Sequence, residues 1–359
     1  MAVAGGGAIG LAVAWRAAGR GLRVVVLERD EPGAGTSAVA AGMLAPVAEV
    51  SLNERPLLEL GLRSAAAYPA FVRELRDESG TDPGYLECGS LLVARDADEA
   101  ESLERELELR RSLGLEVRRL RPSEARRREP GLAPTIRLAL EVPGDHAIDP
   151  RRLTAALAEA CRRAGVELRS RAEVGAIEIE SDRVAGLRLA GGELVSAEQV
   201  VIATGAWSGS IGGLPDEARV AVRPVKGQIL RLRDPAGPGL LNGVLRMADG
   251  YIVPRGDGRY VLGATMEERG FDTTVTAGAV FELLRGAIEL VPGFTELVIE
   301  ELSAGLRPAT ADNLPVLGPG AIPGLHWATG HRRNGILLTP VTAEIVAGAL
   351  AGVPAEVAG

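Results

Sequence analysis

A glycine motif near the N-terminus constrains the fold of this chain more than any other feature. The residues from Gly5 to Gly10, GGGAIG, fit the pattern G-x-G-x-x-G and follow the short apolar stretch Met1 to Ala4. Leu11 to Arg20 is rich in alanine and favours a helix, and Arg23 to Glu28 has the pattern of a buried strand that ends in an acid. This order predicts a βαβ unit with a glycine turn between its first strand and its helix.

Each part of this unit suits the diphosphate of a dinucleotide. Gly5 permits a tight turn, Gly7 lets a pyrophosphate approach the backbone, and Gly10 lets the helix pack on the strand. The helix start offers free N–H groups and a partial positive charge to the phosphates. Glu28 ends the second strand, where an acid accepts hydrogen bonds from ribose hydroxyls and disfavours a 2′-phosphate. We therefore expect a bound dinucleotide.

Two further segments favour FAD over NAD as that dinucleotide. Gly33 to Leu44 is a loop of small residues with hydroxyls and glycines, against which a large, flat cofactor can lie; an ordinary Gly/Ala loop is the alternative. An NAD enzyme would normally continue into another strand and helix at this point. Near the C-terminus, His326 to Pro340 and a helix from Thr342 to Leu350 form a second helix start, which would stabilise the negative charge of a reduced flavin.

Composition bounds the remaining possibilities. A length of 359 residues suits about two domains, and the net charge of -8 implies no general attraction to nucleic acid. The arginine-rich stretch Arg118 to Arg128 is interleaved with Glu and Pro and fits a solvated face. Cys88 and Cys161 have no metal-ligand spacing and make no disulfide framework, and no apolar run reaches the roughly 18 residues of a membrane span. We expect a cytoplasmic protein without metal, nucleic acid or membrane span.

The rest of the chain alternates between helical and strand patterns. Helices are expected at Leu57 to Ser79, Asp96 to Leu113, Arg151 to Ala164 and Ala277 to Val291. Pro143 to Pro150 has the composition of a turn-rich link. Strands are expected at Leu86–Ala94, Val166–Arg169, Glu173–Glu180, Val184–Leu189, Glu193–Val195, Gln199–Ser208, Val222–Leu232, Gly250–Pro254 and Arg259–Ala264.

Several motifs together resemble the D-amino-acid oxidase superfamily, and within it the bacterial glycine oxidases of thiamine biosynthesis. Gly5 to Gly10 and Glu28 are shared with many flavoproteins. More specific are the stretches Thr36 to Leu44, Ala203 to Trp207, Tyr251 followed by Gly263-Ala-Thr-Met266, Ala304-Gly-Leu-Arg307-Pro, and Gly330-His-Arg-Arg-Asn-Gly-Ile-Leu-Leu338. The resemblance runs over essentially the whole chain. The first strand has only four residues before Gly5, fewer than in relatives, which suggests a trimmed start.

The resemblance implies an α/β fold with two domains. One is a Rossmann-like FAD-binding domain of the glutathione-reductase type, expected at residues 1–80, 145–212 and 303–359. The other is an α+β substrate-binding domain on a mixed or antiparallel sheet, expected at residues 81–144 and 213–302. A homo-oligomer, with a tetramer as one form, is also implied.

The resemblance assigns roles to single residues. Arg307 matches the arginine that binds the substrate carboxylate, Tyr251 a tyrosine that can bond the same group, Met266 a border of the pocket, and Arg333 an arginine beside the flavin. A surface position for Arg307 and core packing for Tyr251 and Met266 are the alternatives. Cofactor-binding positions are Gly5, Gly7, Ala8, Ile9, Gly10, Glu28, Arg29, Thr36, Ser37, Ala41, Gly42, Met43, Val174, Trp207, His331, Arg332, Arg333, Asn334, Gly335, Ile336 and Leu337.

The implied activity is oxidation of glycine or another small amino acid, through an imine, to the oxoacid, with ammonia and hydrogen peroxide released and dioxygen consumed. FAD is expected to be non-covalent, because neither Cys88 nor Cys161 lies at the C-terminal position of covalent relatives. Asp249 stands where a glycine oxidase can carry histidine, which leaves sarcosine and small D-amino acids open as substrates. A dehydrogenase with another electron acceptor, a flavin-binding module without catalysis and an NAD dehydrogenase are the remaining alternatives.

Overall fold

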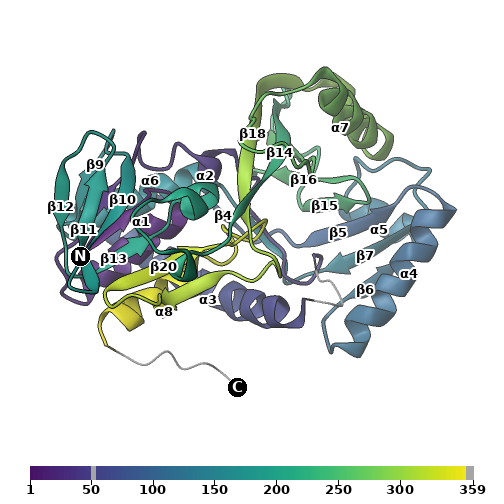
Figure 1. The fold of residues 1–359 in the computed structure, drawn as a ribbon. Coiled ribbons are helices and arrows are strands. Elements are labelled where there is room, and N and C mark those ends of the chain that lie inside the picture. Colours follow the sequence, from purple (N-terminus) through teal and green to yellow (C-terminus); the bar gives the residue numbers. More distant parts are fainter. Residues whose placement is uncertain (50–53, 353–359) are drawn as a thin grey trace.

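Two large β-sheets form the two lobes of the molecule in the computed structural model, which describes residues 1–49 and 54–352 (Figure 1). The first lobe contains the N-terminus and a six-stranded sheet in the order β19-β20-β13-β1-β2-β9, parallel except for β19. Its strands are β1 (Ala2–Ala4), β2 (Val25–Leu27), β9 (Glu167–Arg169), β13 (Val200–Ile202), β19 (Val316–Pro319) and β20 (Leu325–Thr329).

Alternation along the short strands of this sheet explains how both of its faces are covered. Val3 on β1 joins the core formed with the helices, whereas Ala2 and Ala4 join the core on the opposite face. The first face packs against α1 (Ala8–Gly19), α3 (Arg55–Ser79), α6 (Pro150–Arg163) and α8 (Thr339–Leu350). The second face packs against the antiparallel sheet of β10 (Val174–Glu180), β11 (Arg183–Leu189) and β12 (Leu194–Ser196).

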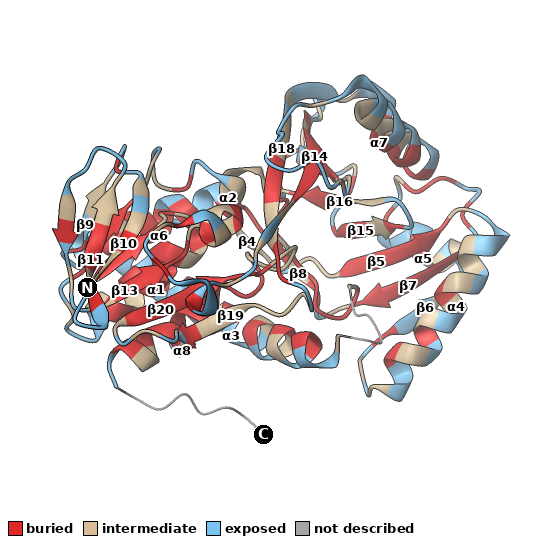
Figure 2. Ribbon diagram, in the orientation of Figure 1, coloured by how far each residue is buried: buried red, intermediate tan, exposed pale blue. Residues whose placement is uncertain are grey.

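The second lobe is built on an eight-stranded mixed sheet in the order β18-β14-β17-β16-β15-β5-β7-β6. All neighbouring strands are antiparallel except β15 and β5. The strands are β5 (Ser90–Ala94), β6 (Arg118–Leu120), β7 (Leu138–Val142), β14 (Arg223–Arg233), β15 (Val244–Met247), β16 (Gly250–Pro254), β17 (Arg259–Gly263) and β18 (Val298–Ala309). The central strands of both sheets are largely buried, whereas β6 and the first half of β18 are mostly exposed (Figure 2).

Helices cover parts of both faces of the large sheet, and short elements join the lobes. One face packs against α7 (Ala277–Leu290) and the other against α4 (Ala97–Ser112). The remaining elements are β3 (Met43–Leu44), β4 (Tyr85–Leu86) and β8 (His146–Ile148), which form a third small sheet, with α2 (Thr36–Val39), α5 (Pro122–Arg128), and the 3-10 helices η1 (Gly205–Ser210), η2 (Asp216–Ala218) and η3 (Pro292–Glu296).

The predicted α/β class, with a mixed sheet in the second lobe, is confirmed. The predicted helices agree with the structure to within a turn, but several expectations for strands were wrong. The strand predicted at Gln199–Ser208 ends at Ile202 and is followed by η1, the strand predicted at Leu86–Ala94 is divided into β4 and β5, and Pro143–Pro150 contains β8. No strand was expected where β3, β6, β7, β15, β18 and β19 lie. The expected domain boundary at residue 302 falls inside β18, so the division into domains stays a prediction.

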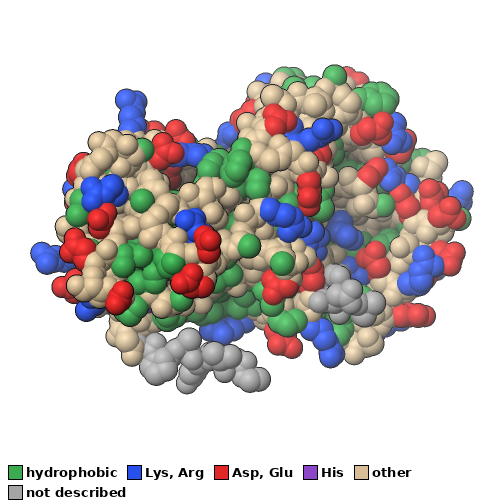
Figure 3. Space-filling view, in the orientation of Figure 1, with side chains coloured by type: hydrophobic (Ala, Val, Ile, Leu, Met, Phe, Trp, Pro, Cys, Tyr) green, Lys and Arg blue, Asp and Glu red, His purple; other side chains and the backbone are tan. Residues whose placement is uncertain are grey.

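The surface carries charged side chains of both signs, as expected from the mixed charge of the sequence. Acidic and basic side chains are interspersed over the face shown in Figure 3. Within the described ranges, no helix is long and apolar enough to cross a membrane. Those same ranges hold no cluster of three or more His, Cys, Asp or Glu side chains that could bind a metal ion.

Two buried ionisable side chains, Asp145 and Arg110, form hydrogen bonds with the backbone of the segment that follows β3. Asp145 accepts hydrogen bonds from Val47 N at 3.2 Å and Ala48 N at 2.7 Å. Arg110 donates to the carbonyl oxygens of the same two residues, at 3.0 and 2.8 Å. Burial raises the pKa of Asp145 to about 7, although both hydrogen bonds act in the opposite direction. This hydrogen-bonded group therefore includes a carboxyl whose pKa lies near neutral pH.

We predict that Asp145 makes the protein less stable as pH rises from about 4 to about 7. In that window the folded state holds a proton that the unfolded state has released, so the free energy of unfolding falls by up to about 1.4 kcal/mol per pH unit. Asp145→Asn should flatten this component of the dependence of Tm on pH. Asp98→Asn, at an exposed position of α4, controls for the lost charge. An unchanged pH profile in Asp145→Asn would contradict the assignment.

Candidate functional site

A cavity of about 730 Å³ lies between the two large sheets and is lined by residues of both. Most of the predicted site residues line it. The exceptions are Gly10, which supports the glycine turn from behind, and Asn334 and Leu337, which line a small neighbouring pocket. Residues as distant in sequence as Gly5 and Ile336 therefore meet around one space. Which of them contact a ligand stays a prediction.

The glycine turn forms one end of the cavity. Gly5 has φ +101, and a Cβ there would lie 2.5 Å from the carbonyl oxygen of Ala203 at the end of β13. A Cβ at Gly10 would collide with the Gly5 carbonyl, so α1 can begin this close to β1 only without that side chain. Gly7 lines the cavity at the start of α1. The turn thus presents bare backbone and a helix N-terminus to a ligand.

Two polar side chains fix the surroundings of this turn. Glu28, which follows β2, accepts hydrogen bonds from Gly6 N at 2.6 Å and from Asp30 N at 3.0 Å. Ser37 accepts a hydrogen bond from Ala8 N at 3.0 Å, in the first turn of α1. Each side chain is therefore held at the cavity wall by backbone donors, and the Glu28 carboxylate is oriented before any ligand binds.

An aromatic stack borders the same end of the cavity. The Arg29 guanidinium lies 3.7 Å from the centroid of the Trp207 ring, which is a cation–π contact. The Trp207 ring lies 5.4 Å from that of Phe271, between centroids. Arg29 and Trp207 belong to the first lobe, whereas Phe271 comes from the loop that joins β17 to α7. The stack therefore connects the two lobes beside the cavity.

An arginine and a tyrosine of the eight-stranded sheet also line the cavity. Arg307 on β18 lies over Gly227 on β14, where any Cβ would collide with the guanidinium. Its Nη1 donates to the carbonyl oxygens of Lys226 at 3.2 Å and Thr265 at 3.0 Å. Burial raises the pKa of Tyr251, while the Arg307 guanidinium acts in the opposite direction. The Tyr251 hydroxyl therefore keeps its proton and can donate a hydrogen bond next to a fixed cation.

The two arginines that precede α8 are already paired with carboxylates. Arg333 pairs with Glu49 at 3.4 Å and with Glu54 at 3.6 Å, and it donates to the Glu49 carbonyl at 2.8 Å. Arg332 pairs with Glu54 at 3.2 Å, and its Nη2 lies 3.9 Å from the sulfur of Met266. Arg333 therefore lines the cavity as part of an ion-paired group, and Met266 lies 60% exposed at its edge.

His331 lies at the cavity wall but carries no charge. Its Nε2 lies 2.9 Å from the Thr342 hydroxyl, and burial lowers its pKa to about 3. The ring is therefore neutral in the physiological range. The helix α8 begins at Thr339, one turn before the expected start, so its N-terminus follows directly on the cavity-lining Gly335 and Ile336.

Lys226 is a buried charged residue that the motifs do not single out. It is the single lysine among the 40 basic residues of the chain. Its side chain is 1% exposed and pairs with Asp272 at 2.9 Å. Gln228, also buried, accepts from Thr276 N at 2.8 Å. Since Gly227 and Ile229 line the cavity, strand alternation places Lys226 and Gln228 on the other face, where they hold the loop between β17 and α7.

Two parts of the cavity suit different ligands: the glycine turn suits the phosphates of a dinucleotide, and the fixed Arg307 guanidinium suits a small carboxylate. That combination defines a dinucleotide-dependent oxidoreductase that brings a small acid to its cofactor. Comparison with known proteins narrows the class: the chain belongs to the family of FAD dependent oxidoreductases, whose model matches residues 1–349. FAD fits the residues present, because the side-chain-free turn at Gly5, the start of α1 at the cavity wall and the oriented Glu28 suit its ADP half.

The relatives include amine-oxidising enzymes. The chain is 39% identical to a glycine oxidase of Geobacillus kaustophilus, over 97% of this chain and 91% of that one. A crystal structure of glycine oxidase from that organism matches with a TM-score of 0.91, covering 99% and 95% of the two chains. A bifunctional ThiO/ThiG protein of Trichormus variabilis is 37% identical over 97% of this chain, which spans 52% of that protein. An iminodiacetate oxidase structure from Chelativorans is 30% identical, with a TM-score of 0.89 and coverage of 99% and 96%.

We predict that the two sides of the Lys226–Asp272 ion pair differ in their effect on stability. Asp272→Asn leaves the buried ammonium without its counter-charge, whereas Lys226→Met leaves a carboxylate on a residue that is 40% exposed and can be hydrated. Asp272→Asn should therefore lower Tm more than Lys226→Met does, measured by thermal unfolding. Asp257→Asn, paired with Arg259 at the surface, is the matched control. An equal loss of Tm in Asp272→Asn and Lys226→Met would contradict the view that Asp272→Asn leaves a buried ammonium without its counter-charge.

Proposed function

We propose that the protein is a glycine oxidase that also accepts other small amino acids. The substrate loses two electrons and two protons to become an imine, which water converts to the oxoacid and ammonia. Dioxygen takes up two electrons and two protons and leaves as hydrogen peroxide. The observation that carries this proposal is that Arg307 and Tyr251, on the eight-stranded sheet, line the same cavity as the glycine turn of the other sheet.

Arg307 is suited to bind the substrate carboxylate. Two carbonyl oxygens hold Nη1, and the guanidinium lies flat over Gly227, so its orientation is fixed before the substrate enters. A planar guanidinium binds a carboxylate with charge-assisted hydrogen bonds in a defined geometry. Tyr251 adds a neutral donor beside it. Together they fix one end of a small amino acid and thereby orient its α-carbon within the cavity.

The chain supplies position and electrostatics, and bound FAD would accept the hydride, which carries both electrons. The carboxylates at the substrate end are engaged in ion pairs, Glu49 with Arg333 and Asp249 with Arg95. The proposed reaction needs no side-chain base, because an amino acid that enters with a neutral amine can expel hydride from its α-carbon. We also propose that FAD is held without a bond to sulfur, since neither Cys88 nor Cys161 borders the cavity.

The proposed pathway, location and oligomeric state rest on similarity to known proteins alone. The relation to ThiO/ThiG proteins supports a role in supplying thiazole synthesis. A cytoplasmic homo-oligomer stays part of the proposal on the same basis. Oxidation of sarcosine or small D-amino acids, and delivery of electrons to an acceptor other than dioxygen, are the alternatives that the same site allows.

A peroxide assay of the FAD-loaded protein tests this function. We expect hydrogen peroxide with glycine under air, and anaerobic glycine should bleach the flavin absorption band. Sarcosine, D-alanine and D-proline, assayed in parallel, rank the substrates. Bleaching without peroxide would favour another electron acceptor, and the absence of bleaching with every small amino acid would sink the proposal.

Replacement of Arg307 should separate substrate binding from cofactor binding. Arg307→Ala removes the carboxylate anchor, and we expect a loss of roughly 2–5 kcal/mol in substrate binding, the scale for truncating one partner of a buried charge pair. The flavin spectrum should be retained, because the glycine turn and Glu28, which suit the ADP half of FAD, are unchanged. Arg105→Ala, at a position that is 64% exposed on α4, is the control. Unchanged kcat/KM for glycine in Arg307→Ala would exclude the assigned role.

A further inference from the structure

A row of cavity residues crosses four neighbouring strands of the large sheet. Ile229 on β14 pairs with Gly263 on β17, which pairs with Tyr251 on β16, which pairs with Arg246 on β15. Directly paired residues project from the same face of a sheet. Ile229, Tyr251 and Arg246 line the cavity, and Gly263 does not. Arg246 is therefore a cation beside Tyr251, on the cavity side of the sheet.

The charge of Arg246 is only partly compensated. Its ion-pair partner is Glu106 on α4, at 3.6 Å, which is beyond hydrogen-bond distance. The same Glu106 oxygen pairs with Arg110 at the shorter distance of 3.0 Å. Two guanidinium groups thus share one carboxylate, and the Asp145 carboxyl near Arg110 directs both of its oxygens to backbone N–H groups. This arrangement leaves excess positive charge at the cavity wall.

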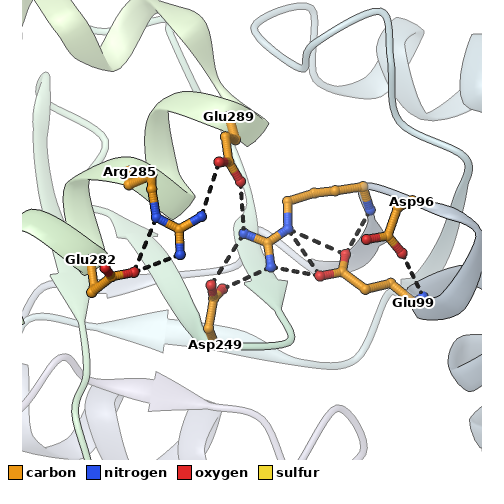
Figure 4. A network of polar contacts seen from close by, with 7 residues as sticks. Asp96, Glu99, Asp249, Glu282, Arg285 and Glu289 are labelled. Atoms are coloured by element: carbon orange, nitrogen blue, oxygen red, sulfur yellow. Dashed lines mark hydrogen bonds and ion pairs between the residues drawn. The ribbon is translucent and has the colours of Figure 1, made fainter.

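Two other carboxylates that line the cavity are engaged elsewhere. Asp249, three residues further along the same hairpin, pairs with Arg95 at 3.2 Å. Figure 4 shows Asp249 directed into a network in which the same arginine also pairs with Glu99 and Glu289. Glu49 is paired with Arg333. A ligand is therefore the natural source of a further negative charge for Arg246.

We propose that Arg246 forms a second anion subsite, so that the protein accepts small amino acids with a second carboxylate. The inference rests on the proposed function, because Arg307 and Tyr251 bind the first carboxylate. Arg246 is the β15 neighbour of Tyr251 and lines the same cavity, so an amino acid held at Arg307 and Tyr251 can direct a second carboxylate toward it. The second carboxylate can be carried on the amine nitrogen, as in iminodiacetate, or on a side chain, as in D-aspartate.

The experiment compares a charged ligand with its neutral isostere. Anaerobic binding of iminodiacetate and of N-(carbamoylmethyl)glycine is measured through the change in the flavin spectrum, and turnover is measured under air. In Arg246→Gln, we expect the preference for the dianionic ligand over the neutral one to fall by about tenfold, the factor that corresponds to 1.4 kcal/mol. Arg105→Gln, exposed on α4, controls for the loss of one positive charge.

The outcomes separate this inference from the proposed function. An unchanged preference in Arg246→Gln overturns the subsite. So does a wild-type protein that oxidises glycine but neither oxidises iminodiacetate nor is inhibited by it. Binding of iminodiacetate that depends on Arg246, in a protein that does not oxidise glycine, supports the subsite and refutes the proposed function. D-aspartate with the same dependence on Arg246 extends the subsite to side-chain carboxylates.

Discussion

The pairing of β14 with β18 is the interaction on which the site depends. The two strands run antiparallel from Arg223 opposite Ala309 to Arg233 opposite Val298. The part of this strand pair near Arg233 and Val298 belongs to the second lobe. The other end of β18 packs on α2, where the Thr36 hydroxyl donates to the Leu306 carbonyl oxygen at 3.0 Å. This long ribbon joins the lobes and sets Arg307 directly over Gly227, so cofactor and substrate ends share one cavity.

Arginine pairing gives the cavity its electrostatic character. Glu49 and Asp249 lie at its wall, but each is paired with an arginine, so neither presents a bare negative charge to an incoming carboxylate. Arg307 donates to neutral carbonyl oxygens and has no carboxylate partner among the described residues, which leaves its charge available. The contrast between paired carboxylates and an unpaired guanidinium makes the substrate end selective for anions.

Local patterns predicted the nucleotide lobe well and parts of the second lobe poorly. The βαβ unit has a strong signal, because the glycine turn, the alanine-rich helix and Glu28 follow one another in sequence. In β18, exposed Val298 and Ile299 are followed by Glu300 and Glu301, so the outer half of the strand has no clean alternation. The β8 strand was hidden because Pro143 to Asp145 has the composition of a turn.

The sequence by itself determined the family, the diphosphate turn and the presence of Arg307 and Tyr251, because those signals lie in short contiguous motifs. It also held one unused signal, the single lysine at position 226. Only the tertiary structure decided which charges are free, since the partners of Arg333, Asp249 and Arg246 come from helices or loops far away in the chain. Ion pairing depends on distance in space, which no local pattern records.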